Sequence, residues 1–238
     1  MCYQSAFRFA TVLAFLAVSI NPLLAQSPDN APPLPSDARL IDFEGEAPSS
    51  VPDAFAPGLT GRGPPARWQI QDDDDAASGR RVITQLSKKR ISARYPLLVL
   101  QDFAARDVDI SVKLKTVSGN IDASGGLIFR FVDERNYYVV RANSLEGNVV
   151  AYRTKNGRRR HIGVVGNRHQ YGVDAPVTHR DWVTLRVIAR GPRFEIFLDG
   201  KRAFDVENRT FAGSGQIGLW TKADAVTQFD DLIVRSLD

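Results

Sequence analysis

The stretch that decides the fold is FEIFLDGKRAFDV, residues 194–206. Apolar residues recur at every second position on both sides of Asp199 and Gly200, which is typical of strands that bury one face. An Asp-Gly pair suits a two-residue type I′ turn, because both central residues of that turn adopt positive φ. The segment therefore predicts an antiparallel hairpin with strands over 194–198 and 201–206.

The same period of two continues along the chain. It is clearest in Val108–Lys115 and Trp182–Arg190, and Asn156-Gly157 predicts a second hairpin between Val149–Lys155 and Arg158–Val164. About a dozen short strands with no helical stretches between them predict an all-β fold. We expect a two-sheet antiparallel jelly-roll sandwich. A barrel or a propeller is less favoured, because strand lengths are irregular and no blade repeat is present.

The composition is that of an ordinary globular protein, with 238 residues, 43% hydrophobic and 24% charged, and a net charge of +4. An apolar segment over residues 9–25 is too short for a membrane span of about 20 residues and predicts a signal peptide over 1–25. An uncleaved N-terminal anchor is the alternative. A proline-rich linker over 26–38 and one domain over 39–238 follow. We therefore expect an exported protein, periplasmic or extracellular, without a transmembrane span after signal cleavage.

Several chemistries have no support in the sequence. The one cysteine is Cys2, so the predicted exported part has no disulfide, thiolate nucleophile or cysteine metal site. Neither a Gly-x-Ser-x-Gly elbow nor a phosphate-binding Walker loop is present, which argues against acyl and phosphoryl transfer. Export also argues against nucleic acid as a partner of this mildly basic chain.

Several segments resemble the concanavalin A-like and laminin-G-like jelly-roll domains: Gly126–Phe131 with Asn136–Asn143, Phe194–Lys201, Gly215–Trp220 and Phe229–Leu232. The nearest branch is the group of bacterial exported domains related to 3-keto-disaccharide hydrolases. The resemblance covers roughly residues 39–236 and implies a sandwich fold with a carbohydrate ligand. It leaves the activity open, because this fold carries lectins, glycan-binding modules and hydrolases.

The chain departs from the glucanases of this fold in one respect. Those enzymes carry Glu-x-Asp-x-x-Glu on one strand, which places two carboxylates on one face about 5 Å apart for a retaining mechanism. Neither Glu195–Asp199 nor Asp107–Asp109 has this spacing. Laminarinase-type hydrolysis is therefore not expected, and the question of whether the protein is an enzyme stays open.

Polar side chains that project from otherwise apolar strands form the predicted ligand site. Tyr137, Arg141 and Asn143 share one face of a strand if the residues between them point into the core. In the related folds that face is concave. Aromatic rings suit the apolar face of a sugar, and Arg and Asn donate to its hydroxyls. The predicted ligand-binding residues are Arg130, Tyr137, Arg141, Asn143, Trp220 and Lys222. The alternative is a solvated outer face with Trp220 in the core.

A second group is acidic. Asp42 and Glu44 lie in the first predicted strand, and Asp230 and Asp231 lie in the last. If the terminal strands pair, these carboxylates repel one another unless a cation such as Ca²⁺ binds between them. This grouping predicts a structural calcium site. The alternative is that the carboxylates accept hydrogen bonds from loop amides or pair with arginines.

Two runs of like charge remain. Asp72–Asp75 is predicted to be a solvated loop, because it lacks the spacing of a known calcium loop. Arg158–His161, with Lys155, forms a basic hairpin tip. Contact of this tip with an acidic polysaccharide or with lipid headgroups is the alternative to a purely solubilising role.

The function that these observations favour is carbohydrate binding in a groove on the concave face. The first alternative is an enzyme acting on glycosides, of the 3-keto-disaccharide hydrolase or lyase kind, in which an acid such as Glu134 or Glu146 and a divalent cation activate the sugar. The second is a structural module of the envelope. A carboxylate or histidine beside Arg141 is what the enzyme needs and the binding module does not.

Overall fold

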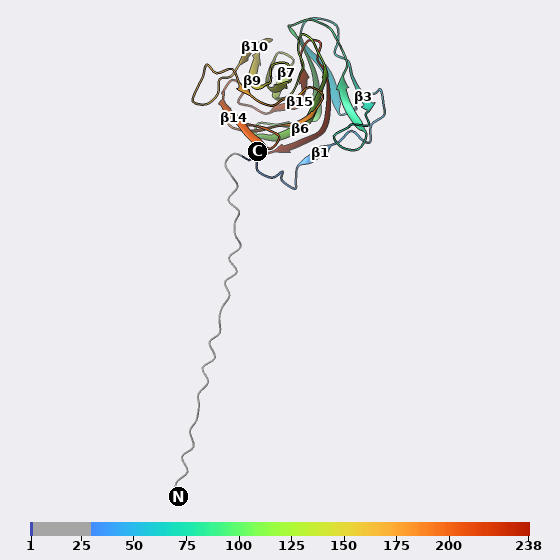
Figure 1. The fold of residues 1–238 in the computed structure, drawn as a ribbon. Helices are drawn as coiled ribbons and strands as arrows, with labels where there is room; N and C mark the ends of the chain where they lie inside the picture. Colours follow the sequence, from blue (N-terminus) through green and yellow to red (C-terminus); the bar gives the residue numbers. More distant parts are fainter. Residues whose placement is uncertain (2–29) are drawn as a thin grey trace.

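The protein is built from β-strands in its computed structural model, which describes residue 1 and residues 30–238 (Figure 1). Apart from Met1, the predicted signal peptide lies outside the described residues. The strands are β1 (Arg39–Ile41), β2 (Phe55–Gly61), β3 (Trp68–Asp72), β4 (Arg81–Gln85), β5 (Arg94–Ala105), β6 (Val108–Ser118), β7 (Ser124–Asp133), β8 (Asn136–Asn143), β9 (Asn148–Lys155), β10 (Arg158–His161), β11 (Val173–Asp174), β12 (Trp182–Arg190), β13 (Arg193–Leu198), β14 (Lys201–Glu207), β15 (Gly215–Thr221) and β16 (Val226–Ser236).

The strands form two antiparallel sheets. Sheet A has the order β14-β13-β12-β6-β16-β4-β3, with β1 paired to β16. Sheet B has the order β10-β9-β8-β7-β15-β5-β2, with β11 paired to β9. In Figure 1 the labelled strands of sheet B lie above β6 and β14 of sheet A. The two-sheet sandwich predicted from the sequence is confirmed. Among the described residues, no helix is long and apolar enough to cross a membrane.

Both predicted hairpin turns are present. Asp199 and Gly200 have φ of 49° and 74° and join β13 to β14. Asn156 and Gly157 have φ of 52° and 76° and join β9 to β10. Both pairs therefore have the positive φ that a type I′ turn requires at its two central positions.

The main core lies between the sheets. Alternation along β6 sends Ile110, Val112 and Leu114 into this core. Phe194 of sheet A meets Phe129 of sheet B edge to face, with ring centroids 5.0 Å apart. The sequence pattern thus places one face of each sheet in a single shared core.

The described part of the predicted linker, residues 30–38, contacts the domain. The amide of Ala31 donates to the carbonyl of Gly200 at 2.7 Å, and Arg235 pairs with Asp37 at 2.8 Å. Arg186 donates to the carbonyl of Pro32. Residues 30–38 therefore pack on sheet A, where the sequence predicts a solvated tether. Proline lacks an amide donor but keeps its carbonyl acceptor, which the contact between Pro32 and Arg186 uses.

Candidate functional site

The alternation predicted for β8 is present. Tyr138, Val140 and Ala142 belong to the core between the sheets. Tyr137 and Val139 belong to a second apolar cluster, whose members all come from sheet B. Sheet B therefore buries side chains on both faces, one against sheet A and one on the side turned away from it.

Sheet B curls strongly around the second cluster. The hydroxyl of Tyr137 on β8 lies 2.8 Å from Oγ1 of Thr60 on β2, although three strands separate β8 from β2 in the sheet. The guanidinium of Arg159 on β10 lies over the rings of Tyr95 on β5 and Trp220 on β15. Strands so far apart can meet only across a concave face. We call this concave face of sheet B, lined by the second cluster, the hollow.

The floor of the hollow is aromatic and aliphatic. Its buried members are Leu97, Val99, Ile128, Tyr137, Val139, Val150, Tyr152 and Trp220. The partly exposed ring of Tyr95 stacks on Trp220 with centroids 5.7 Å apart and planes 16° apart. Gly126 lies between Trp220 and Arg141 in the strand register and adds no side chain there. Tyr95 therefore presents a ring to solvent over a rigid base.

Two of the predicted ligand-binding residues form this base and do not reach solvent. Tyr137 and Trp220 are each 0% exposed. In this conformation neither side chain has exposed surface with which to contact a ligand, because the curl of the sheet closes over them. Tyr95, which is not among the predicted ligand-binding residues, covers Trp220 and takes the accessible position.

Arg159 crosses the hollow from the edge strand β10. Its guanidinium carbon lies 4.2 Å from the ring centre of Tyr152, 4.7 Å from that of Tyr95 and 5.2 Å from that of Trp220. Among the described residues, no carboxylate forms an ion pair with Arg159, and its Nη1 has no hydrogen-bond partner. Cation–π attraction holds the side chain while its donor capacity stays unused.

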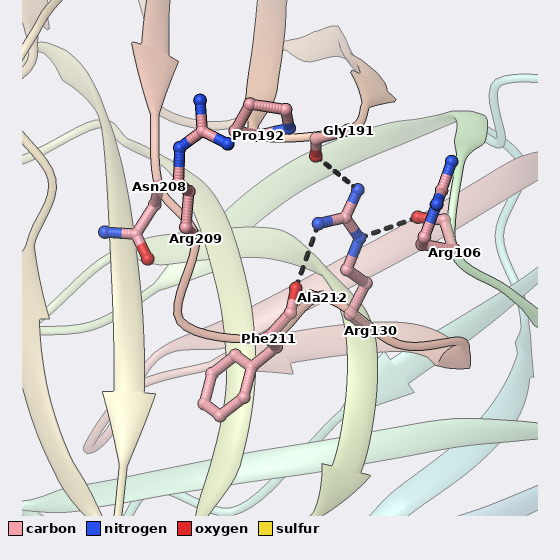
Figure 2. A pocket seen from close by; sticks show the side chains of 8 residues that line it. All are labelled: Arg106, Arg130, Gly191, Pro192, Asn208, Arg209, Phe211 and Ala212. Atoms are coloured by element: carbon pink, nitrogen blue, oxygen red, sulfur yellow. Dashed lines mark hydrogen bonds between the residues drawn. The ribbon is translucent and has the colours of Figure 1, made fainter.

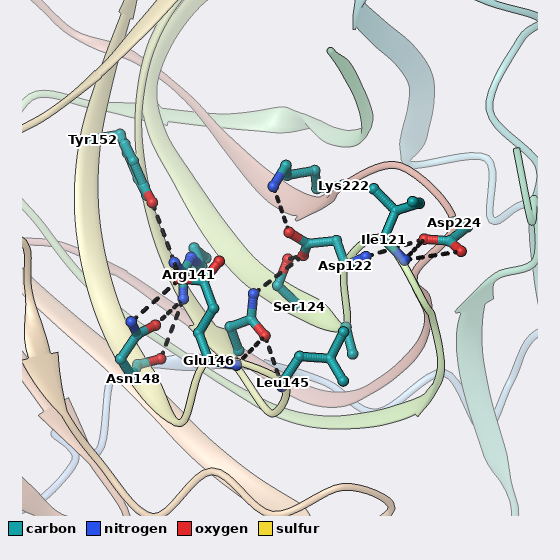
Figure 3. Close-up of polar contacts among 12 residues, drawn as sticks. Ile121, Asp122, Ser124, Arg141, Leu145, Glu146, Asn148, Tyr152, Lys222 and Asp224 are labelled. Atoms are coloured by element: carbon teal, nitrogen blue, oxygen red, sulfur yellow. Dashed lines mark hydrogen bonds and ion pairs between the residues drawn. The ribbon is translucent and has the colours of Figure 1, made fainter. Parts of the chain in front are cut away.

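Arg141 is the centre of a polar network at one end of the hollow (Figure 3). It is 2% exposed and donates through Nη2 to Glu146 Oε2 at 2.6 Å and to the hydroxyl of Tyr171 at 3.2 Å. Nη1 donates to Oδ1 of Asn148. Tyr171 is exposed, so the network reaches solvent through Tyr171 and Glu146 rather than through Arg141.

Asn143 builds the turn that brings Glu146 to Arg141. Its Oδ1 accepts from the amides of Leu145 at 2.8 Å and Glu146 at 3.1 Å, and the residue is 1% exposed. Burial alone would raise the pKa of Glu146, but the charge of Arg141 and its hydrogen bond, with a further bond from Asn148, lower that pKa. Glu146 is therefore a carboxylate at neutral pH, and Asn143 has a positioning role.

Lys222 belongs to a neighbouring group on the same sheet. Its ammonium lies 2.6 Å from Oδ2 of the buried Asp122, and its side chain is 19% exposed. Asp224 holds the loop before β7 by accepting from the amides of Asn120, Ile121 and Asp122. Asn143 Nδ2 lies 3.4 Å from Asp122 Oδ1, which joins the two groups (Figure 3). The structure thus brings Arg141, Asn143 and Lys222 together, as expected.

Arg130 lies elsewhere. The strand register is irregular after Phe129, and Arg130 has a φ of 46°. Both turn the Arg130 side chain away from the hollow and over the ring of Phe194 in sheet A. Its guanidinium is 2% exposed and donates to the carbonyls of Arg106, Gly191 and Phe211 (Figure 2). This bulge reverses the alternation from Arg130 onward, so the side chain does not lie on the face that strict alternation predicts. Arg130 closes one end of the sandwich.

The acidic group comes together but does not converge as metal ligands. Glu44 accepts from the amides of Arg80 and Arg81, and Asp42 accepts from the amide of Glu44. Lys113 lies 2.7 Å from Asp231. The buried Asp230 accepts from the amides of Ser78 and Asp231.

Among the described residues, no group of three or more His, Cys, Asp or Glu side chains is placed to hold a metal ion. The structure therefore shows the alternative arrangement for Asp42, Glu44, Asp230 and Asp231, with loop amides and Lys113 as partners. Amide donors and Lys113 stabilise these carboxylates in part.

The acidic run Asp72–Asp75, predicted to be a solvated loop, forms ion pairs through three of its four carboxylates with Lys115 and Arg81. The ammonium of Lys115 lies 3.0 Å from carboxylate oxygens of Asp73 and Asp75. Asp72 lies 3.4 Å from Arg81. Asp74 is almost fully exposed and matches the expectation.

The fold and the hollow together define the class: an all-β jelly-roll sandwich whose second sheet forms an aromatic and polar concave face. The chain belongs to the 3-keto-alpha-glucoside-1,2-lyase-like domain family, whose model matches residues 62–235. The family resemblance expected from the sequence is therefore confirmed.

Solved structures are similar to this chain at low sequence identity. The carbohydrate-binding module CBM66 from Bacillus subtilis is 19% identical, with a TM-score of 0.58 over 77% of this chain and 96% of that chain. Domain 4 of AbnA, an extracellular arabinanase from Geobacillus stearothermophilus solved with arabinotriose, is 12% identical, with a TM-score of 0.47 over 83% and 92%. The Caenorhabditis elegans galectin LEC-6 is 18% identical, with a TM-score of 0.41 over 55% and 84%. A comparison with curated proteins finds no significant match. At this level of identity, the similarity to CBM66 shows the fold alone.

Proposed function

We propose that the domain binds carbohydrate in the hollow of sheet B. The observation that carries this proposal is the contact of the unpaired Arg159 guanidinium with the partly exposed ring of Tyr95. A sugar needs an apolar plate for its C–H face and planar donors for its hydroxyls. Tyr95 supplies the first, and Arg159 has donors to supply the second.

The accessible contact residues are Tyr95, Arg159, Tyr171, Glu146 and Lys222. They differ from the buried base of Tyr137, Trp220, Arg141 and Asn143, whose role is to position them. Such a site is largely preorganised, because Tyr95 and Arg159 lie on strands. Glu146 and Lys222 are held by ion pairs that exist without ligand. The similarity in fold to a carbohydrate-binding module agrees with this proposal.

Catalysis is the second candidate function. Glu146 is a partly exposed carboxylate beside Arg141, and the exposed His161 meets Tyr171 edge to face with ring centres 5.5 Å apart. Glu146 and His161 are thus side chains that could transfer a proton, and they lie at the same end of the hollow as Arg141, where an enzyme would need such a group. Membership in a lyase-like family favours turnover of a 3-keto glycoside, in which the oxidised carbon would make the neighbouring C–H acidic enough for Glu146 or His161 to remove its proton.

Calorimetric titration with a panel of neutral oligosaccharides and 3-keto disaccharides, with product formation followed in the same samples, tests both candidates. We expect at least one member to bind and Tyr95→Ala to weaken it by roughly tenfold or more. Trp182→Ala, which removes a partly exposed ring from sheet A, is the matched control. A panel without any binder would overturn the proposal. Turnover that disappears in Glu146→Gln, while binding persists, would establish the enzyme.

Export is part of the same proposal, because the apolar segment over residues 9–25 is typical of a signal peptide. N-terminal sequencing of the protein recovered from the periplasm and from the medium tests it, with Gln26 expected as the first residue after cleavage. Recovery of an uncleaved chain with the membranes would instead support the N-terminal anchor.

A further inference from the structure

The β9–β10 hairpin sets positive side chains directly opposite one another. In the strand register Arg160 faces Arg153, and Arg158 faces Lys155. Like charges at directly opposite positions destabilise an antiparallel pair. Two successive pairs of this kind on one face are therefore an energetic cost that the fold of the hairpin does not explain.

These four cations and Asn156 line a cleft of about 220 Å³ at the edge of sheet B. Alternation places them on the face opposite Arg159, whose strand partner is Thr154. The cleft is thus separate from the hollow, although both use β10.

Carboxylates do not neutralise the cleft. Among the described residues, none of the four cations forms an ion pair, and Arg153 donates to the hydroxyl of Thr210 at 3.1 Å. The adjacent Asp133 accepts from the amide of Arg135 and the side chain of Asn136 instead. Arg135 itself donates to the carbonyl of Asn156, which adds a fifth positive charge beside the turn.

We propose that this cleft binds an oxyanion group, a carboxylate, sulfate or phosphate, carried by an acidic saccharide. Three of its four cations are arginines, whose planar guanidinium binds such groups through two parallel hydrogen bonds. The saccharide identity rests on the proposed function: a chain that leaves the hollow past Arg159 crosses β10 and brings its next charged unit to the cleft.

A saccharide fits the geometry better than a membrane surface does. The four side chains converge into a cleft rather than project from a convex face, and a group on a flexible polymer can enter such a cleft. Stable membrane attachment also needs a second anchor beside the basic patch. Near the end of the adjacent strand β7, a single large apolar side chain, Val132, is exposed, which is too little for such an anchor.

Binding of the full chain to three polymers tests the inference: polygalacturonate, dextran sulfate and neutral dextran. The variant Arg158→Gln/Arg160→Gln is compared with Lys88→Gln/Lys89→Gln, which removes the same charge from an exposed loop between β4 and β5. We expect the first to weaken binding to the anionic polymers by roughly tenfold or more and the second to change it by at most about twofold. The affinity should also fall steeply with salt. Equal losses in both variants would overturn the site.

Two further arms identify the source of the oxyanion. In the first arm, the protein is titrated with neutral phosphatidylcholine vesicles and with vesicles that contain phosphatidylglycerol. In the second arm, it is titrated with inorganic phosphate alone. Binding to the anionic vesicles as strong per charge as binding to the polymers would replace the saccharide by a membrane. Arg158→Gln/Arg160→Gln should leave binding of neutral oligosaccharides unchanged, whereas Tyr95→Ala should weaken it by roughly tenfold or more. A Tyr95→Ala variant that binds neutral oligosaccharides as tightly as the parent would count against the hollow alone. An Arg158→Gln/Arg160→Gln variant that binds the anionic polymers as tightly as the parent would count against the cleft.

Discussion

The hydroxyl groups of Thr60 and Tyr137 lie 2.8 Å apart, although β5, β15 and β7 separate their strands in sheet B. Oγ1 of Thr60 donates its one proton to the carbonyl of Glu134, so Tyr137 is the donor in the bond between the two hydroxyls. This contact ties one edge of the curled sheet to its middle. It explains why the concave face is closed over Tyr137 and Trp220 and open at Tyr95.

Tyr137→Phe should lower the free energy of unfolding by about 1 kcal/mol, because it removes one buried hydrogen bond and leaves the ring in place. Urea unfolding of Tyr137→Phe, Thr60→Val and the double variant measures this. The double variant should lose less than the sum of the single losses, because both remove the same contact. Strictly additive losses would show that the two hydroxyls do not interact.

Glu146→Gln should reduce stability by about 1 kcal/mol at neutral pH, since it weakens the bond to the buried Arg141 from a side chain that is itself partly exposed. The lowered pKa of Glu146 fixes the sign of the pH dependence. Its contribution to stability is present above the pKa of the unfolded chain and is lost as the pH falls through the folded value.

Denaturant unfolding at a series of pH values checks this, with Asp53→Asn as an exposed control. The difference between the parent protein and Glu146→Gln should shrink in acid. A difference that stays constant down to pH 3 would contradict the ion pair.

Asp230 should show the opposite dependence. Burial raises the pKa of this carboxyl to about 6, and the amide donors of Ser78 and Asp231 only partly offset that effect. Its contribution to stability is fully present below the unfolded pKa and is lost as the pH rises through the folded pKa. For this group alone, stability falls by about 2 kcal/mol between pH 4 and pH 7. Carbon-13 NMR of the Asp230 carboxyl should give a titration midpoint near pH 6, and a midpoint below 4 would refute the raised pKa.

Arg158→Gln/Arg160→Gln should stabilise the protein in the absence of ligand, by about 0.5 to 1 kcal/mol, because it removes two repulsive cross-strand pairs. Thermal unfolding at low ionic strength measures the gain, and added salt should diminish it by screening the repulsion in the parent protein. Lys88→Gln/Lys89→Gln should give little or no gain. If the cleft variant were less stable than its parent, the cations would be structural rather than a site for an anion.

Most of the strands and hairpins of this fold can be predicted from local sequence pattern. Alternation in Val108–Lys115 and the Asp199-Gly200 and Asn156-Gly157 turns place strands and hairpins, because side-chain period and turn φ are properties of a few adjacent residues. The common face of Tyr137, Arg141 and Asn143 follows for the same reason. The bulge at Arg130 could not be predicted in this way, because nothing in the sequence Gly126–Phe131 marks where the register shifts.

The candidate site is less predictable, because it depends on curvature. Sequence alternation tells that Trp220 lies on one face of sheet B, but only the curl of the sheet decides that Tyr95 covers it and that Arg159 reaches it from β10. Arg159 is hidden in a run of arginines that suggests a solvated tip. Period two within Arg158–His161 separates it from its neighbours, and this was the one local signal available.

The dissociation constant of the tightest neutral oligosaccharide, compared between the parent protein and Tyr95→Ala/Arg159→Gln, tests the central claim most directly. The account predicts a loss of roughly 100-fold or more, because the double variant removes both the ring and the donors that the hollow offers. A dissociation constant that stays within about twofold of the parent value, with the fold intact by circular dichroism, would place the carbohydrate site outside the hollow.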